Sequence, residues 1–197
     1  MQTLSKLLLI TSLSLFSQES LKAEDIDNES PKNMIEVLLP EKSRVMDSNA
    51  VIHWTAEGVE STYIVSLTDL FDRVVYQRET TNNYFKVNFV NPDSDNAQMV
   101  FFSVALKGNE EVSSNKHLIQ TLSKKEQNDL RSKMNEELEG STYGNDALAC
   151  VTLANFYEQY NLLVDASDNY IKAIELSSDE DSVIRFNEFK NRNFQSN

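Results

Sequence analysis

The stretch that most constrains the fold is Ala147 to Ser178, ALACVTLANFYEQYNLLVDASDNYIKAIELSS. Its apolar residues recur at three- and four-residue steps, which place side chains on one face of a helix. In the first half these residues are Cys150, Leu153, Ala154 and Tyr157; in the second they are Ala166, Tyr170, Ala173 and Ile174. We therefore predict two short helices, 147–160 and 164–176, whose alanines let the two backbones approach closely.

The ends of these helices carry their own signals. Asn145 or Asp146 can accept a hydrogen bond from a free N–H at the start of the first helix. Asn161 interrupts the pattern, and asparagine tolerates the left-handed conformation that ends many helices. The sequence thus predicts a tight turn between two packed helices.

This pattern resembles one tetratricopeptide repeat, a helical hairpin of about 34 residues. The large, small and aromatic positions of the family fall on the residues listed above, from Cys150 to Ala173. Two positions depart from it: Cys150 stands where a larger residue is usual, and Ser178 where proline is frequent. The resemblance implies a surface that holds a peptide or a partner helix.

One such hairpin cannot bury both of its faces, so neighbouring helices are expected on either side of it. Upstream, Lys124 to Leu138 has helical spacing, and Ser123 with Glu126 can form a capping box. Downstream, Asp181 to Phe194 predicts a closing helix. We expect an all-α C-terminal domain of about four helices over residues 123–197.

Residues 34–122 have a different period, with short β-prone runs between turn residues. Seven strands are expected: 35–39, 50–56, 62–68, 73–77, 85–89, 99–106 and 116–121. This spacing predicts an antiparallel β-sandwich. Pro40, Trp54, Tyr63 and the run 100–114 resemble a fibronectin type III domain of the immunoglobulin-like class, although its sixth-strand tyrosine is missing. We expect Trp54 in the core.

The N-terminus has the features of a secretory signal peptide. Lys6 precedes an apolar run of ten residues, Leu7 to Phe16, and Ala23 is the best cleavage position. We predict a signal peptide over 1–23, a flexible linker over 24–33, and a periplasmic or secreted protein without stable membrane insertion after cleavage. An uncleaved N-terminal anchor is the alternative.

Charge and cysteine content exclude several classes of protein. The net charge is −13, which opposes binding to nucleic acid or to anionic lipid. Cys150 is the only cysteine, so the chain has neither an internal disulfide nor a cysteine-based zinc cluster.

Patterns that carry catalysis are missing from the sequence. There is no phosphate-binding loop and no Gly-x-Ser-x-Gly elbow. His53 and His117 have no metal-ligand partner at helix or hairpin spacing, and we expect both at the surface. Residues 93–96 resemble the start of a calcium loop, but Gln98 stands where the loop needs glycine. We therefore expect no catalytic, cofactor-binding or metal-binding residues and no cofactor.

These observations favour an exported, non-catalytic interaction or scaffold protein of the cell envelope, whose partner is another protein or peptide. The expected partner-binding residues are Tyr160, Asp179, Glu180 and Asp181. The plainer interpretation of the three acids is that they complement the dipole of the last helix. One alternative is a carbohydrate- or ligand-binding module that uses Tyr76 and Tyr84 on the sandwich. An unrecognised enzyme is the second alternative.

Overall fold

The computed structural model describes residues 35–47, 49–56, 61–89, 98–138, 146–177 and 179–194. Residues Asn33–Asn197 form one compact unit with a mixed β and α fold. The predicted signal peptide (1–23), the linker (24–33) and the calcium-loop-like run (93–96) lie outside the described residues.

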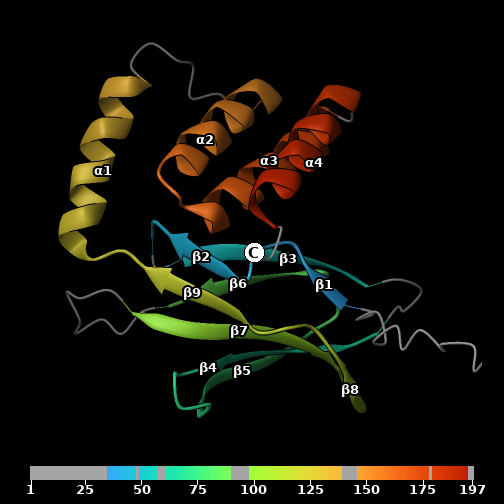
Figure 1. Ribbon diagram of the computed structural model, residues 1–197. Coiled ribbons are helices and arrows are strands. Elements are labelled where there is room, and N and C mark those ends of the chain that lie inside the picture. Colours follow the sequence, from blue (N-terminus) through green and yellow to red (C-terminus); the bar gives the residue numbers. More distant parts are fainter. Residues whose placement is uncertain are drawn as a thin grey trace, which may run out of the picture. The chain divides into compact units, whose positions relative to one another are not determined.

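The described part of the chain contains nine strands and four helices (Figure 1). The strands are β1 (Ile35–Val37), β2 (Lys42–Val45), β3 (Asn49–Ala56), β4 (Tyr63–Thr68), β5 (Val74–Thr80), β6 (Tyr84–Asn88), β7 (Met99–Leu106), β8 (Asn109–Ser113) and β9 (His117–Thr121). The helices are α1 (Lys124–Glu137), α2 (Ala147–Gln159), α3 (Leu163–Ser177) and α4 (Glu180–Asn193).

The strands form a three-stranded sheet and a six-stranded sheet. The first has the order β1-β3-β6, and the second has the order β2-β9-β7-β4-β5 with β8 paired to β7. All pairs are antiparallel except β2 and β9, which run parallel with Lys42 opposite Leu118. The six-stranded sheet is therefore mixed.

The expectation of about seven antiparallel strands in a sandwich is wrong in strand number and in arrangement. The two additional strands are β2 and β8. Strand β2 exists because β9 supplies its partner, although its sequence, KSRV, is short and half polar. Strand β8 follows a turn at Gly108, whose φ of 83° favours glycine, and its sequence, NEEVS, is too polar to predict a strand.

The core of the strand region joins residues from both sheets. Trp54 of β3 is 1% exposed, and its ring meets the ring of Tyr63 of β4 edge-on at a centroid distance of 5.6 Å. Phe102 of β7 and Ile119 of β9 are fully buried in the same cluster. The predicted place of Trp54 in the core is confirmed.

All four helices were expected, and the local signals at their ends are present. Ser123 caps α1, and its capping box with Glu126 is complete. The Asp146 carboxylate caps α2 by accepting a hydrogen bond from the N–H of Ala149 at 2.8 Å. Asn161 has a φ of 57°, the left-handed conformation that its position after α2 requires.

Helices α2 and α3 pack closely because small residues lie at their contact. Ala154, Ala166 and Ala173 are completely buried, and Tyr170 fills the space beside them. Helix α3 also packs against β2 and β3, and its Val164 belongs to the core cluster of the strands. Helix α3 is therefore the element that connects the helices to the strands. None of the helices among the described residues is both long and apolar enough to cross a membrane.

Candidate interaction surface

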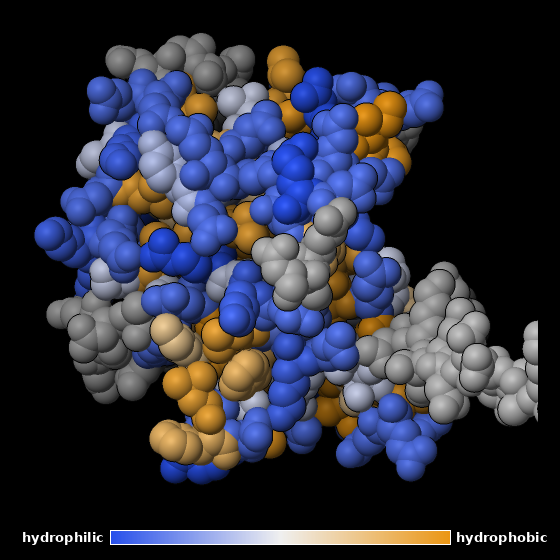
Figure 2. Space-filling model, viewed as in Figure 1, coloured by the Kyte–Doolittle hydropathy of each residue, from blue (hydrophilic) through white to orange (hydrophobic). Residues whose placement is uncertain are grey.

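The β4–β5 hairpin carries four of the ten large hydrophobic residues that are exposed among the described residues. Leu70 is 55% exposed, Phe71 80%, Val74 59% and Val75 56%. We call these four residues the hairpin patch. Figure 2 shows hydrophobic surface gathered over this end of the molecule. Apolar groups that lie together on a surface mark contact sites more often than scattered ones do.

The turn that presents the hairpin patch is held by its own side chains. The Asp69 carboxylate accepts hydrogen bonds from the backbone N–H of Phe71 at 2.9 Å and from that of Arg73 at 3.0 Å. The Arg73 guanidinium donates to the same carboxylate at 2.7 Å and thereby lowers the pKa of Asp69. Lys116 pairs with Asp72 at 2.6 Å and ties the turn to the segment before β9.

Phe71 is consequently presented in a defined position. The guanidinium of Arg73 lies over its ring at 5.5 Å from the centroid, and Asp72 adopts a left-handed φ of 60° beside it. A side chain fixed before binding loses less conformational entropy when a partner covers it. The hairpin patch therefore combines exposed apolar area with an ordered backbone.

The sequence-predicted partner residues lie at two separate places. Tyr160 follows α2, where its ring packs against Phe156 at 4.7 Å and its hydroxyl donates a hydrogen bond to Glu137. Asp179, Glu180 and Asp181 lie at the start of α4. Helix α3, about 22 Å long, runs between these two places, so Tyr160 and the three acids do not form one site.

Two of the three acids at the start of α4 have partners within that helix. The Asp179 carboxylate accepts a hydrogen bond from the N–H of Ser182 at 2.8 Å, and this bond lowers the pKa of Asp179. Asp181 pairs with Arg185 at 2.7 Å. Glu180 is exposed.

Near these acids, Leu176 is 54% exposed, and Val183 and Ile184 are also exposed. This end of the helices therefore offers a second, smaller apolar surface.

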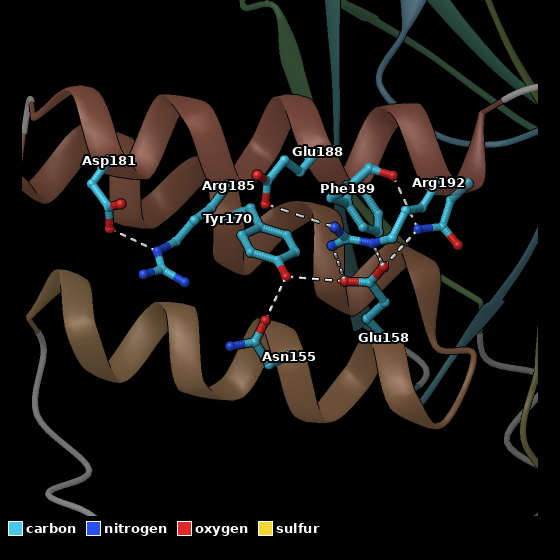
Figure 3. A network of polar contacts seen from close by, with 9 residues as sticks. Asn155, Glu158, Tyr170, Asp181, Arg185, Glu188, Phe189 and Arg192 are labelled. Carbon is cyan, nitrogen blue, oxygen red and sulfur yellow. Dashed lines mark hydrogen bonds and ion pairs between the residues drawn. The ribbon is translucent and has the colours of Figure 1, made fainter.

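A polar network connects α2, α3 and α4 (Figure 3). The Glu158 carboxylate accepts hydrogen bonds from Arg192 at 2.8 and 2.9 Å and from Asn193 at 2.8 Å. The Tyr170 hydroxyl lies 2.7 Å from Asn155 Oδ1 and 3.0 Å from Glu158 Oε2. Burial disfavours the charge on Glu158, but these donors outweigh it and lower its pKa. Because every member has a partner, the network fixes the three helices relative to one another.

A second polar cluster lies where α3 meets the strands. His53 Nε2 is 3.1 Å from Asp168 Oδ1, and Lys172 Nζ is 2.6 Å from Asp168 Oδ2. Asp165 is partly buried beside them, and its Oδ2 accepts a hydrogen bond from the N–H of Met46 at 2.7 Å. Burial raises the pKa of Asp165 to about 7, with the charges of Asp47 and Asp168 acting in the same direction.

The prediction that both histidines lie at the surface is wrong. The side chain of His53 is 13% exposed because α3 covers it. His117 is 7% exposed, and its Nδ1 lies 3.0 Å from the carbonyl oxygen of Pro40. Burial lowers the pKa of His117. Both residues therefore take part in packing.

The two tyrosines expected for a carbohydrate- or ligand-binding module do not form one site. Tyr76 lies on β5 of the six-stranded sheet, where its ring approaches Phe85, whereas Tyr84 lies on β6 of the three-stranded sheet beside His53. The two tyrosines therefore do not share a sheet face. Among the described residues, no three His, Cys, Asp or Glu side chains are grouped to hold a metal ion.

The hairpin patch was missed from the sequence, because residues 69–72 were expected only to connect the strands 62–68 and 73–77. The available signal was the composition of that turn, since Leu70 and Phe71 are large apolar residues at positions where polar residues and glycine are usual. Two adjacent apolar residues at a hairpin tip have no core to enter. Such residues indicate an exposed contact surface.

The sequence matches no protein-family model and no curated protein. Among solved structures it is similar to the crystal structure of a beta-1,2-glucanase from Parabacteroides distasonis, with 10% sequence identity and a TM-score of 0.29. The similarity covers 71% of this chain and 23% of that chain. A likeness at this score supports no inference about fold or activity.

Proposed function

We propose that this chain is an exported, non-catalytic protein that binds another protein or peptide, as a scaffold or assembly subunit of the cell envelope. The observation that carries the proposal is the hairpin patch, with Phe71 80% exposed on a turn that Asp69 holds in place. Hot spots of protein interfaces are enriched in large side chains that insert into a partner. The periplasmic or secreted location follows from the predicted signal peptide.

The proposal also includes relationships to two known domain families. The α2–α3 pair, with buried alanines at its contact, supports a relationship to tetratricopeptide repeats. The two sheets with Trp54 between them support a relationship to immunoglobulin-like or fibronectin type III domains. We also propose Tyr160, Asp179, Glu180 and Asp181 as contacts of a second partner surface on the helices, because exposed Leu176, Val183 and Ile184 lie near the acids.

The test is a crosslinked pull-down from the native envelope with the mature chain as bait. The informative variant is Phe71→Lys, which places a charge at the centre of the hairpin patch. The matched control is Leu148→Lys, because Leu148 is comparably exposed, at 76%, but lies at the start of α2.

We expect a partner that wild type and Leu148→Lys both capture and that Phe71→Lys loses. Since Phe71 is exposed, its replacement leaves the folded structure intact, which circular dichroism verifies. A set of captured proteins that is identical for all three baits would refute binding through the hairpin patch.

A further inference from the structure

Strand β5 is the last strand of the six-stranded sheet. Its only strand partner among the described residues is β4, so its other edge presents backbone N–H and C=O groups that no strand accepts. The strand is seven residues long, and five of its seven side chains are exposed. An uncovered edge of this length is a template for pairing with a further strand.

The sequence of β5 lacks several devices that protect sheet edges. Val74–Thr80 reads VVYQRET and contains no proline, no glycine and no lysine. The register irregularity of the β4–β5 pair lies at one end, between Leu67 and Thr68, so the rest of the strand stays regular. This edge is therefore open to strand addition, whereas lysine, proline or a central bulge would block it.

The charge of β5 indicates what can pair with it. The chain carries a net charge of −13, so two copies repel each other over most of their surfaces. Strand β5, by contrast, carries one cation, Arg78, and one anion, Glu79. Arg78 lies over the ring of Tyr76 at 5.8 Å from its centroid, and Glu79 pairs with Lys107 at 2.7 Å. An identical strand therefore meets β5 without net repulsion.

We propose that β5 pairs antiparallel with β5 of a second copy of this chain, so that the two six-stranded sheets become one continuous sheet across a two-fold axis. This inference rests on the proposed function as an interaction protein, for which it names one partner. Pairing centred on Gln77 places Arg78 opposite Tyr76 of the second copy, which repeats across the axis the contact made within each chain. Leu70 and Phe71 of the hairpin patch then flank the dimer contact at both ends, whereas Val74 and Val75 lie within the paired strands.

The first test is the molar mass of the mature chain, measured by sedimentation equilibrium over a wide range of concentration. The variant Gln77→Lys brings two lysines together at the axis, where like charges directly opposite each other are destabilising. The control Asn109→Lys adds the same charge to β8, an exposed strand of the same sheet. We expect a dimer for wild type and the control, and a dissociation constant at least about tenfold higher for Gln77→Lys.

The second test locates the contact. Opposite residues of antiparallel strands have Cα atoms about 4.5–5.5 Å apart, a distance that a disulfide can span. We expect Gln77→Cys to form a crosslinked dimer under mild oxidation and Asn109→Cys to remain uncrosslinked. The native Cys150 is buried and does not interfere.

A wild-type chain that stays monomeric at every concentration would overturn the inference, as would a dimer that Gln77→Lys leaves unchanged. These outcomes are distinct from failure of the proposed function. A monomer that still captures its partner through Phe71 removes only the self-pairing. A β5 dimer whose captured proteins ignore Phe71→Lys removes only the heterologous binding.

Discussion

The side chains of His53 and Asp168 meet at 3.1 Å although 115 residues separate them in sequence. His53 comes from strand β3 and Asp168 from helix α3, and both side chains are nearly buried. Lys172, one turn further along α3, binds the second oxygen of Asp168 at 2.6 Å. A polar contact therefore joins the strands and the helices beside the apolar contact that Val164 makes.

This contact predicts energetic coupling between the two residues. In a double-mutant cycle with His53→Ala and Asp168→Ala, we expect a coupling energy of about 1 to 3 kcal/mol, since either single change leaves a largely buried polar partner unsatisfied. Urea unfolding of the four proteins measures it. Asp129→Ala on exposed α1 is the control, with no coupling to His53. Strictly additive effects of the first pair would show that the contact does not stabilise the fold.

Asp165 predicts a specific pH dependence of stability. Its pKa rises from 3.8 to about 7 on folding, so the folded chain holds more protons than the unfolded chain between these pH values. Ionisation of this partly buried carboxyl therefore destabilises the fold as pH rises through that window, by a few kcal/mol at most.

Asp165→Asn removes this ionisable group and keeps an oxygen that can accept the Met46 N–H. We expect the variant to be more stable than wild type at pH 8 and close to wild type at pH 4. Thermal unfolding followed by circular dichroism at both pH values measures the difference. If the two proteins differ equally at both pH values, the proposed titration of Asp165 is wrong.

The packing of α2 against α3 predicts that a larger side chain at Ala154 is not tolerated. Ala154 is fully buried between the helices, so Ala154→Leu forces them apart at a cost of about 1–3 kcal/mol or more. Chemical denaturation measures the loss. Gln159→Leu, an exposed position of the same helix, serves as control with a change below about 0.5 kcal/mol. Equal stabilities of the two variants would contradict close packing at Ala154.

The turn at the hairpin patch predicts local order that depends on one carboxylate. Asp69→Ala removes the acceptor of the Phe71 and Arg73 N–H groups, so we expect both amides to exchange faster with solvent. Hydrogen exchange followed by NMR resolves the two amides. Glu110→Ala on exposed β8 should leave them unchanged. Unaltered exchange in Asp69→Ala would mean that the hairpin itself, and not its side chains, orders the turn.

The helices could be predicted closely from the sequence. The expected helices 147–160 and 164–176 correspond to Ala147–Gln159 and Leu163–Ser177, because helical spacing, the cap at Asp146 and the left-handed Asn161 all point to the same ends. Strands β2 and β8 were missed for the opposite reason. Their residues have little strand preference of their own, and neighbouring strands decide their conformation.

The site was harder to predict than the fold. His53 alternates with buried Trp54, so the two-residue period of a strand placed it on the solvent face. The period is correct, but α3 covers that face, and no local pattern shows which distant helix will return to it. Leu70 and Phe71 were missed because turns are expected to be polar.

The position of α3 has a consequence for how the chain acquires its structure. A ribosome releases the strands of residues 35–121 long before residues 163–177 exist, yet β2 and β3 are covered only when that late helix arrives. Contacts between residues so far apart in sequence slow folding, because a long loop must close before they form. The packing between strands and helices is therefore completed only when almost all of the chain has been synthesised.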